Sequence, residues 1–145
     1  MAKVLAGMYR GTVVSVDDPE NRYRVLVNVP SVTGDYAAGW AEPCFQYCAD
    51  TEGDCFLPVI GDTIWVMFEE GKLNRPVWIG NWYATAKAPQ DIATSKTKRV
   101  IMYQGTKIVI GGGVVEVIGN LAVQGNITAT GSISATGTVT GSNIE

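Results

Sequence analysis

Three cysteines carry the most reactive side chains in this 145-residue chain. Cys44, Cys48 and Cys55 fall within one loop-like segment. A closed structural zinc site needs four ligands, and this segment offers no obvious fourth. The chain has no histidine, which excludes Ser-His-Asp triads, Cys-His dyads and histidine-based metal sites. The three cysteines are the candidates for a metal site, but free thiols in a loop are the favoured interpretation, and we expect no cofactor.

Paired carboxylates are the other groups that could do chemistry, because neighbouring acids can divide general acid and base roles between them. Asp17 and Asp18 open a turn-forming cluster, and Glu69 and Glu70 open a predicted hairpin loop. Carboxylates in turns are typical of solvated loops. Catalysis would also need a cleft with activated groups, which the sequence does not indicate. We therefore expect that the protein is not an enzyme.

The charges divide the chain in two. Residues 1–107 carry all eleven Lys and Arg side chains, whereas residues 108–145 carry only Glu116 and Glu145. The net charge of −3 argues against nucleic acid as a partner, since phosphate binding needs a basic surface. The C-terminal stretch is too polar to span a lipid bilayer, and the apolar run near the N-terminus is too short for a signal peptide. We therefore expect a soluble protein that is made in the cytoplasm.

The elements that position the N-terminal residues are predicted to be strands. Residues 9–16 are rich in β-forming types, and residues 22–29 alternate, with Tyr23, Val25, Val27 and Val29 on one face. Further strands are expected at residues 40–43, 63–68 and 76–82. About five strands without helical periodicity predict a small closed barrel of the OB type. Both faces of the strand at residues 63–68 are apolar, so both must be covered.

Several runs in this half resemble one family of barrels. They are Gly11–Val14, Asp18–Pro19, Trp40–Pro43, Leu57–Glu69 and Pro76–Gly80. In this order, over about residues 9–82, they resemble the N-terminal OB domain of the central spike proteins of contractile phage tails and related injection systems, the baseplate assembly protein V family. The resemblance implies a homotrimer that docks to a baseplate hub protein through its barrels.

The C-terminal part repeats every six residues after a predicted linker at residues 83–97 and a predicted hairpin at residues 100–110. Glycine opens each hexad, and the third residue is always aliphatic. Alternate residues of a strand share a face, so the third and fifth positions are predicted to form one buried core. Its members are Val115, Val117, Leu121, Val123, Ile127, Ala129, Ile133, Ala135 and Val139.

A single chain is not expected to hold this repeat in place. Ordering six residues costs about 6–12 kcal/mol of backbone entropy. Burying one Ile and one Ala returns about 2–4 kcal/mol, and each ladder hydrogen bond adds about 1 kcal/mol. Several chains wound about one axis would cover every strand edge and share one aliphatic core. The arithmetic requires more than one chain; three chains, forming an intertwined trimeric β-prism over residues 98–145, follow from the resemblance.

Two other interpretations of the repeat remain. A left-handed β-helix of the hexapeptide acyltransferase type places an aliphatic residue before each glycine, whereas Gln124, Thr130 and Thr136 occupy that position here. The usual general base of that family is a histidine, which this chain lacks. A disordered Gly/Ser/Thr tail is the second interpretation, and the regular aliphatic placement argues against it.

The expected fold class is therefore all-β, with an OB-type barrel at residues 1–82, a linker at 83–97 and a trimeric prism at 98–145. The resemblance implies the central spike of a contractile tail, a virion protein driven into the target cell envelope. The second apolar face of the barrel is expected to contact the hub or neighbouring barrels through Trp65, Met67, Trp78 and Trp82. Without a histidine, the chain cannot form the iron-binding tip found in some spikes, so a small tip protein is expected at the C-terminal end.

The main alternative function uses the same barrel differently. OB barrels also bind single-stranded nucleic acid or oligosaccharides through exposed aromatic side chains. Tyr23, Trp40 and Trp78 could serve, with the hexads as an oligomerising tail. Lys and Arg are not clustered around these aromatics in the sequence, which favours the spike.

Overall fold

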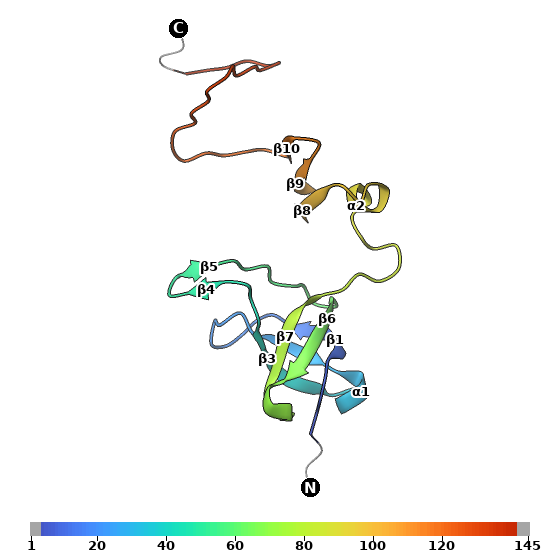
Figure 1. The fold of residues 1–145 in the computed structure, drawn as a ribbon. Coiled ribbons are helices and arrows are strands. Elements are labelled where there is room, and N and C mark those ends of the chain that lie inside the picture. Colours follow the sequence, from blue (N-terminus) through green and yellow to red (C-terminus); the bar gives the residue numbers. More distant parts are fainter. Residues whose placement is uncertain (1–3, 142–145) are drawn as a thin grey trace. The chain divides into compact units, whose positions relative to one another are not determined.

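The computed structural model describes residues 4–141 and divides the chain into two compact units, Met1–Ala88 and Pro89–Glu145 (Figure 1). We call them the barrel unit and the C-terminal unit. No helix among the described residues is long and apolar enough to cross a membrane. The last residues of the chain, where the tip protein was expected, lie outside the described residues.

Five strands of the barrel unit close on themselves in the order β1-β2-β3-β7-β6. They are β1 (Tyr9–Ser15), β2 (Val25–Asn28), β3 (Ala37–Pro43), β6 (Thr63–Phe68) and β7 (Pro76–Asn81). Strands β3 and β7 run parallel, and all other neighbours are antiparallel. This closed five-stranded barrel agrees with the OB-type barrel predicted from the alternating pattern.

The barrel core is built from one face of each strand, because successive side chains of a strand point to opposite faces. Val25 and Val27 of β2 and Ile64 and Val66 of β6 are fully buried, as their alternation predicts. The core contains Leu5, Val13, Val25, Val27, Val29, Ala41, Ile64, Val66, Phe68 and Trp78. Tyr23 departs from the predicted face: it precedes β2, has a φ of 57° and is exposed.

Short elements connect the strands of the barrel. Helix α1 (Pro30–Thr33) follows β2, and the 3-10 helix η1 (Glu69–Gly71) joins β6 to β7. Between β3 and β6 the chain leaves the barrel and folds back as a two-stranded hairpin, β4 (Cys48–Ala49) and β5 (Glu52–Gly53). All four strand residues of this hairpin are exposed, and Figure 1 shows it standing away from the barrel. We call residues 46–55 the arm.

The C-terminal unit begins with helix α2 (Gln90–Thr94), which lies inside the segment predicted to be a linker. A helix of one turn leaves no periodicity in the sequence, so its absence from the prediction is understandable. Three antiparallel strands follow: β8 (Arg99–Tyr103), β9 (Thr106–Gly111) and β10 (Val114–Ile118). The sheet order β10-β9-β8 places β9 in the centre and leaves β8 and β10 as edges. An Asp91–Lys107 ion pair of 2.7 Å ties α2 to β9.

The predicted prism does not appear in the single chain. The first hexad forms β10, which pairs with β9 of the same chain. Residues 119–141, the rest of the repeat that the structure describes, contain no strand. A strand needs a neighbouring strand for its hydrogen bonds, and the tail of one chain offers none.

Candidate docking and assembly surfaces

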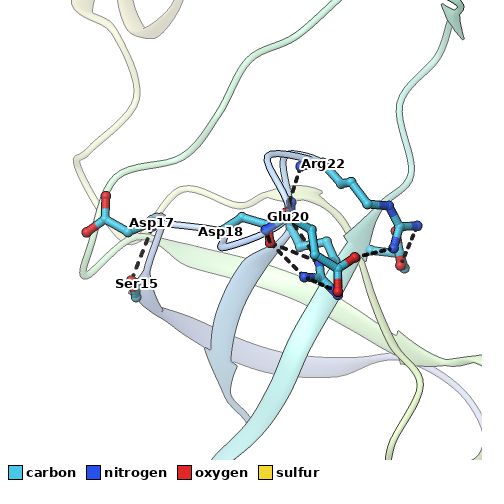
Figure 2. Close-up of polar contacts among 7 residues, drawn as sticks. Ser15, Asp17, Asp18, Glu20 and Arg22 are labelled. Carbon is cyan, nitrogen blue, oxygen red and sulfur yellow. Dashed lines mark hydrogen bonds and ion pairs between the residues drawn. The ribbon is translucent and has the colours of Figure 1, made fainter.

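Polar contacts of Asp18 hold the acidic turn after β1 together. Asp18, labelled in Figure 2, is buried. It forms an ion pair with Arg24 at 2.7 Å. Its carboxylate also accepts hydrogen bonds from the backbone N–H groups of Glu20, Arg22 and Arg24. These donors, the Arg24 side chain above all, lower the pKa of Asp18 far below its ordinary value of 3.8. Asp18 is therefore engaged in holding the turn, and it has no proton to exchange near neutral pH.

The same turn is tied to strand β3. Arg22 lies between Glu20, at 3.1 Å, and Glu42 of β3, at 2.8 Å. Asp17, the other member of the sequence pair, is exposed, and its backbone N–H donates to the Ser15 hydroxyl (Figure 2). The second carboxylate pair, in η1, is exposed as well, and Glu70 pairs with Lys72. The Glu69–Glu70 pair thus lies in a solvated turn, as the sequence indicated, whereas Asp18 of the first pair is buried in its turn.

The three cysteines flank or belong to the arm. Cys48 lies in β4, Cys44 follows β3 and Cys55 follows β5, and all three are exposed free thiols. Burial of its sulfur and the charge of Asp54 raise the pKa of Cys55, which makes this thiol less reactive. Among residues 4–141 no group of three metal-binding side chains comes together.

The outer face of β1 and β6 carries an aromatic surface with a cation on it. Arg10 and Trp65 are directly opposite each other in the β1–β6 register. The Arg10 guanidinium lies 4.4 Å from the Trp82 ring centre and 5.5 Å from that of Trp65, which are cation–π distances. Met67, the next residue on this face of β6, is exposed. We call Arg10, Trp65, Met67 and Trp82 the outer patch.

Trp78 does not belong to this surface, which corrects the sequence-based expectation. Its side chain is only 3% exposed and lies in the barrel core, edge-on to Phe45 at 5.4 Å. The reason is register: Trp78 pairs with Val66, an inward residue, and a bulge between Trp65 and Val66 shifts the pairing beyond that point. That shift lets Trp82, beyond the end of β7, approach Trp65 at 6.2 Å.

Two features of the outer patch lack a partner in the described residues. No carboxylate of residues 4–141 lies within ion-pair distance of Arg10. The indole N–H of Trp82 is buried without an acceptor in the same part of the chain. The Arg10 guanidinium is therefore the polar group of this surface that another molecule could pair with.

The predicted prism residues form an exposed aliphatic stripe. The register places Ile101, Ile108 and Val117 on one face of the β8–β10 sheet, and Ile110 and Val115 beside them. Each of these side chains is exposed, as are Leu121, Val123, Ile127, Ile133 and Val139 farther along. Folded monomeric proteins rarely leave so continuous a series of large aliphatic side chains in water.

The aromatic side chains of the nucleic-acid alternative do not form one surface. Trp78 is in the core, whereas Tyr23 is exposed at the turn before β2. Arg24 lies 6.0 Å from the Trp40 ring, but Asp18 and Glu20 neutralise it. A groove for single strands needs free cations beside its aromatics, so this geometry argues against the nucleic-acid alternative.

Arg10 and the Asp18–Arg24 pair are the residues that sequence reasoning missed. The sequence shows that Arg10 alternates with Tyr9 and Gly11 in a strand, which places it outward. Its position against Trp65 depends on the pairing of β1 with β6, two strands far apart in the chain. The spacing of Asp18 and Arg24 around a turn is visible in the sequence, but many surface charges share such a spacing.

The comparisons with known proteins agree with this barrel. A family model, described as the type VI secretion system/phage-baseplate injector OB domain, matches residues 9–83. The match starts at the first residue of β1 and ends just after Trp82 of the outer patch. The search of curated proteins returned no match to the chain.

Proposed function

Because the chain belongs to the family of type VI secretion and phage-baseplate injector OB domains, we propose that it is the central spike of a contractile injection device. Proteins of this family are structural parts of baseplates and spikes, and the barrel of this chain is the shared domain. The finer proposal is that three copies assemble through the hexad repeat. The resulting shaft passes through the target cell envelope when the device contracts.

The exposed aliphatic stripe is the observation that carries the proposal. Val115 is 64% exposed and Ile133 is 75% exposed in the single chain. Burying such side chains gains roughly 1.5–3 kcal/mol each, and three chains sharing one axis would collect that gain in every layer. The polar Thr, Ser and Asn side chains between them would then face water. Hydrogen bonds between chains would run along the whole shaft and distribute an axial load.

Light scattering on the full chain tests the assembly. We expect the mass of three copies for the natural chain. Ile127→Asp should yield a smaller species, because it would place three carboxylates in one apolar layer. Asn126→Asp is the matched control: it adds the same charge at the neighbouring residue, on the outward side, and should remain trimeric. A trimer from Ile127→Asp, or a monomer from the natural chain, would contradict the proposal.

The role in the particle needs a separate measurement. Particles assembled with Ile127→Asp should lose their central spike density in electron micrographs and their ability to kill or inject, whereas particles with Asn126→Asp should keep both. Active particles without spike density would contradict the piercing role. That result would leave the chain as a barrel with some other task in the baseplate.

A further inference from the structure

The arm and the outer patch belong to different parts of the barrel unit. In the ring of strands β1-β2-β3-β7-β6, the neighbours of β3 are β2 and β7, so the β1–β6 pair lies across the barrel from it. The arm extends the chain beyond β3, and Arg10 and Trp65 belong to β1 and β6. Figure 1 shows the arm and the β1–β6 pair well separated.

The arm is acidic where it is most exposed. Asp50 lies in its turn, Glu52 is the first residue of β5, and Asp54 follows β5. Asp54 accepts the backbone N–H of Tyr47 at 2.8 Å, and Glu52 accepts the Tyr47 hydroxyl at 3.3 Å. Asp50 has no hydrogen-bond or ion-pair partner in residues 4–141. The Asp50 carboxylate of the arm is therefore available to pair with a group from another molecule.

The outer patch carries the opposite charge. It offers a guanidinium that stacks on two indole rings and has no ion-pair partner in residues 4–141. A carboxylate accepts hydrogen bonds from a guanidinium and neutralises its charge. Stacking on the indoles holds the guanidinium in place, so an arriving carboxylate would meet a rigid donor.

We propose that the arm of one copy docks on the outer patch of the next copy, with Asp50 beside Arg10. The proposal rests on the trimer proposed above and names a contact between its barrels. The arm and the outer patch are two different surfaces of one subunit, so their contact is head-to-tail, and it closes into a ring when the rotation between copies fits a whole number of copies. In a ring of three copies, each arm would contact the outer patch of the next copy, so that all three arms and all three patches are paired.

Crosslinking within the full chain tests this contact. Met67→Cys places a thiol on the outer patch, and Cys48 is already present on the arm. A short bismaleimide should then join chains, and peptide mass spectrometry should identify a link between position 67 and Cys48. Adding Cys48→Ser should remove that link. A thiol introduced by Asp35→Cys, at an exposed turn after α1, is the matched control and should not react with Cys48 of another copy.

Charge reversal identifies the pair. Arg10→Glu in the Met67→Cys chain should lower the yield of the link by about tenfold, the change expected for about 1.4 kcal/mol of lost contact. Adding Asp50→Arg should restore it, because the two charges are exchanged. Restoration also shows that Arg10→Glu did not unfold the barrel. High salt should weaken the link in the natural pair, as it does for exposed charges.

The outcomes separate this inference from the proposed function. A trimer by light scattering that gives no link between position 67 and Cys48 would overturn the arm contact alone, and the outer patch would then belong to another protein. A link that Arg10→Glu leaves unchanged would overturn the pairing of Asp50 with Arg10. A natural chain that stays monomeric would overturn both the trimer and the contact.

Discussion

Asp18 illustrates how much of a loop one buried carboxylate can fix. Its two oxygens accept from three backbone N–H groups and from Arg24, so the turn between β1 and β2 has a single arrangement. Arg22 then connects this turn to Glu42 of β3. Asp18 thus has a structural role in the turn between β1 and β2, whereas Asp17, its neighbour in the sequence, is exposed.

The pH dependence of folding should report these contacts of Asp18. Because the folded-state pKa of Asp18 lies below its ordinary value of 3.8, the carboxylate stabilises the fold fully above that value. The contribution is lost as the pH falls further. The Tm of the natural chain should therefore drop between about pH 5 and pH 2 more steeply than that of Asp18→Asn. Equal slopes in calorimetry would show that the ion pair does not contribute to stability.

Gly11 is the second residue where a single change should matter. It lies in β1 on the inner face, and a Cβ there would be 2.9 Å from Cγ2 of Val66 and 3.0 Å from the Asn28 carbonyl oxygen. Gly11→Ala should therefore destabilise the barrel by about 1–3 kcal/mol. Val14→Ala, on the exposed side of the same strand, should change the stability much less. Denaturant unfolding followed by tryptophan fluorescence measures both, and equal midpoints would contradict the tight packing.

At the scale of elements, the β8–β9 hairpin is set by its turn. Gln104 and Gly105 have φ values of 47° and 83°, the left-handed backbone of a two-residue turn. Gly105→Ala should destabilise the hairpin by about 1 kcal/mol, since a side chain is disfavoured there. Gln104→Asn should stabilise it, because Asn tolerates this conformation better. Hydrogen exchange of the β8 and β9 amides checks both directions, and matching rates in the two variants would contradict this account.

The barrel strands could be predicted from the sequence, and their partners could not. The alternation of apolar and polar residues located β2, and a run that is apolar on both faces located β6. Both patterns can be read from the sequence because they depend only on the order of residues within one strand. Trp78 was misplaced because its face depends on the bulge between Trp65 and Val66, which only the pairing of β6 with β7 reveals. For the same reason the stacking of Arg10 on Trp82 could not be foreseen. The hexad repeat predicted the aliphatic residues of the C-terminal unit. It did not predict that its first hexad, β10, pairs with β9, because this hexad has the same pattern as those that follow it.

At the scale of the whole molecule, the two units carry opposite charge. Residues 4–88 hold six Lys and Arg side chains against eleven Asp and Glu side chains. Residues 89–141 hold four against two. An acidic barrel repels the nucleic-acid backbone, whereas contacts between an acidic arm and Arg10 remain possible within a ring of copies.

This charge distribution predicts the result of a direct test of the nucleic-acid alternative. Single-stranded DNA should not be retained by the full chain in filter binding at low salt, because the barrel offers no free cluster of cations to release counterions. A variant with Asp50→Arg and Glu52→Arg is a useful comparison, since it reduces the repulsion without touching the core. Tight binding by the natural chain that weakens steeply with added salt would favour the alternative.

The closed barrel and the open-edged sheet also differ in when they can form. A barrel has satisfied all its strand edges within one polypeptide, so it can fold as soon as it leaves the ribosome. In the proposed trimer, other copies would cover the edges of β8 and β10 and the aliphatic residues after them. Refolding should therefore show a first phase whose rate is independent of protein concentration and a later one that accelerates with it. Synthesis of several copies from one messenger RNA would shorten the time during which these strand edges and aliphatic side chains are exposed to water.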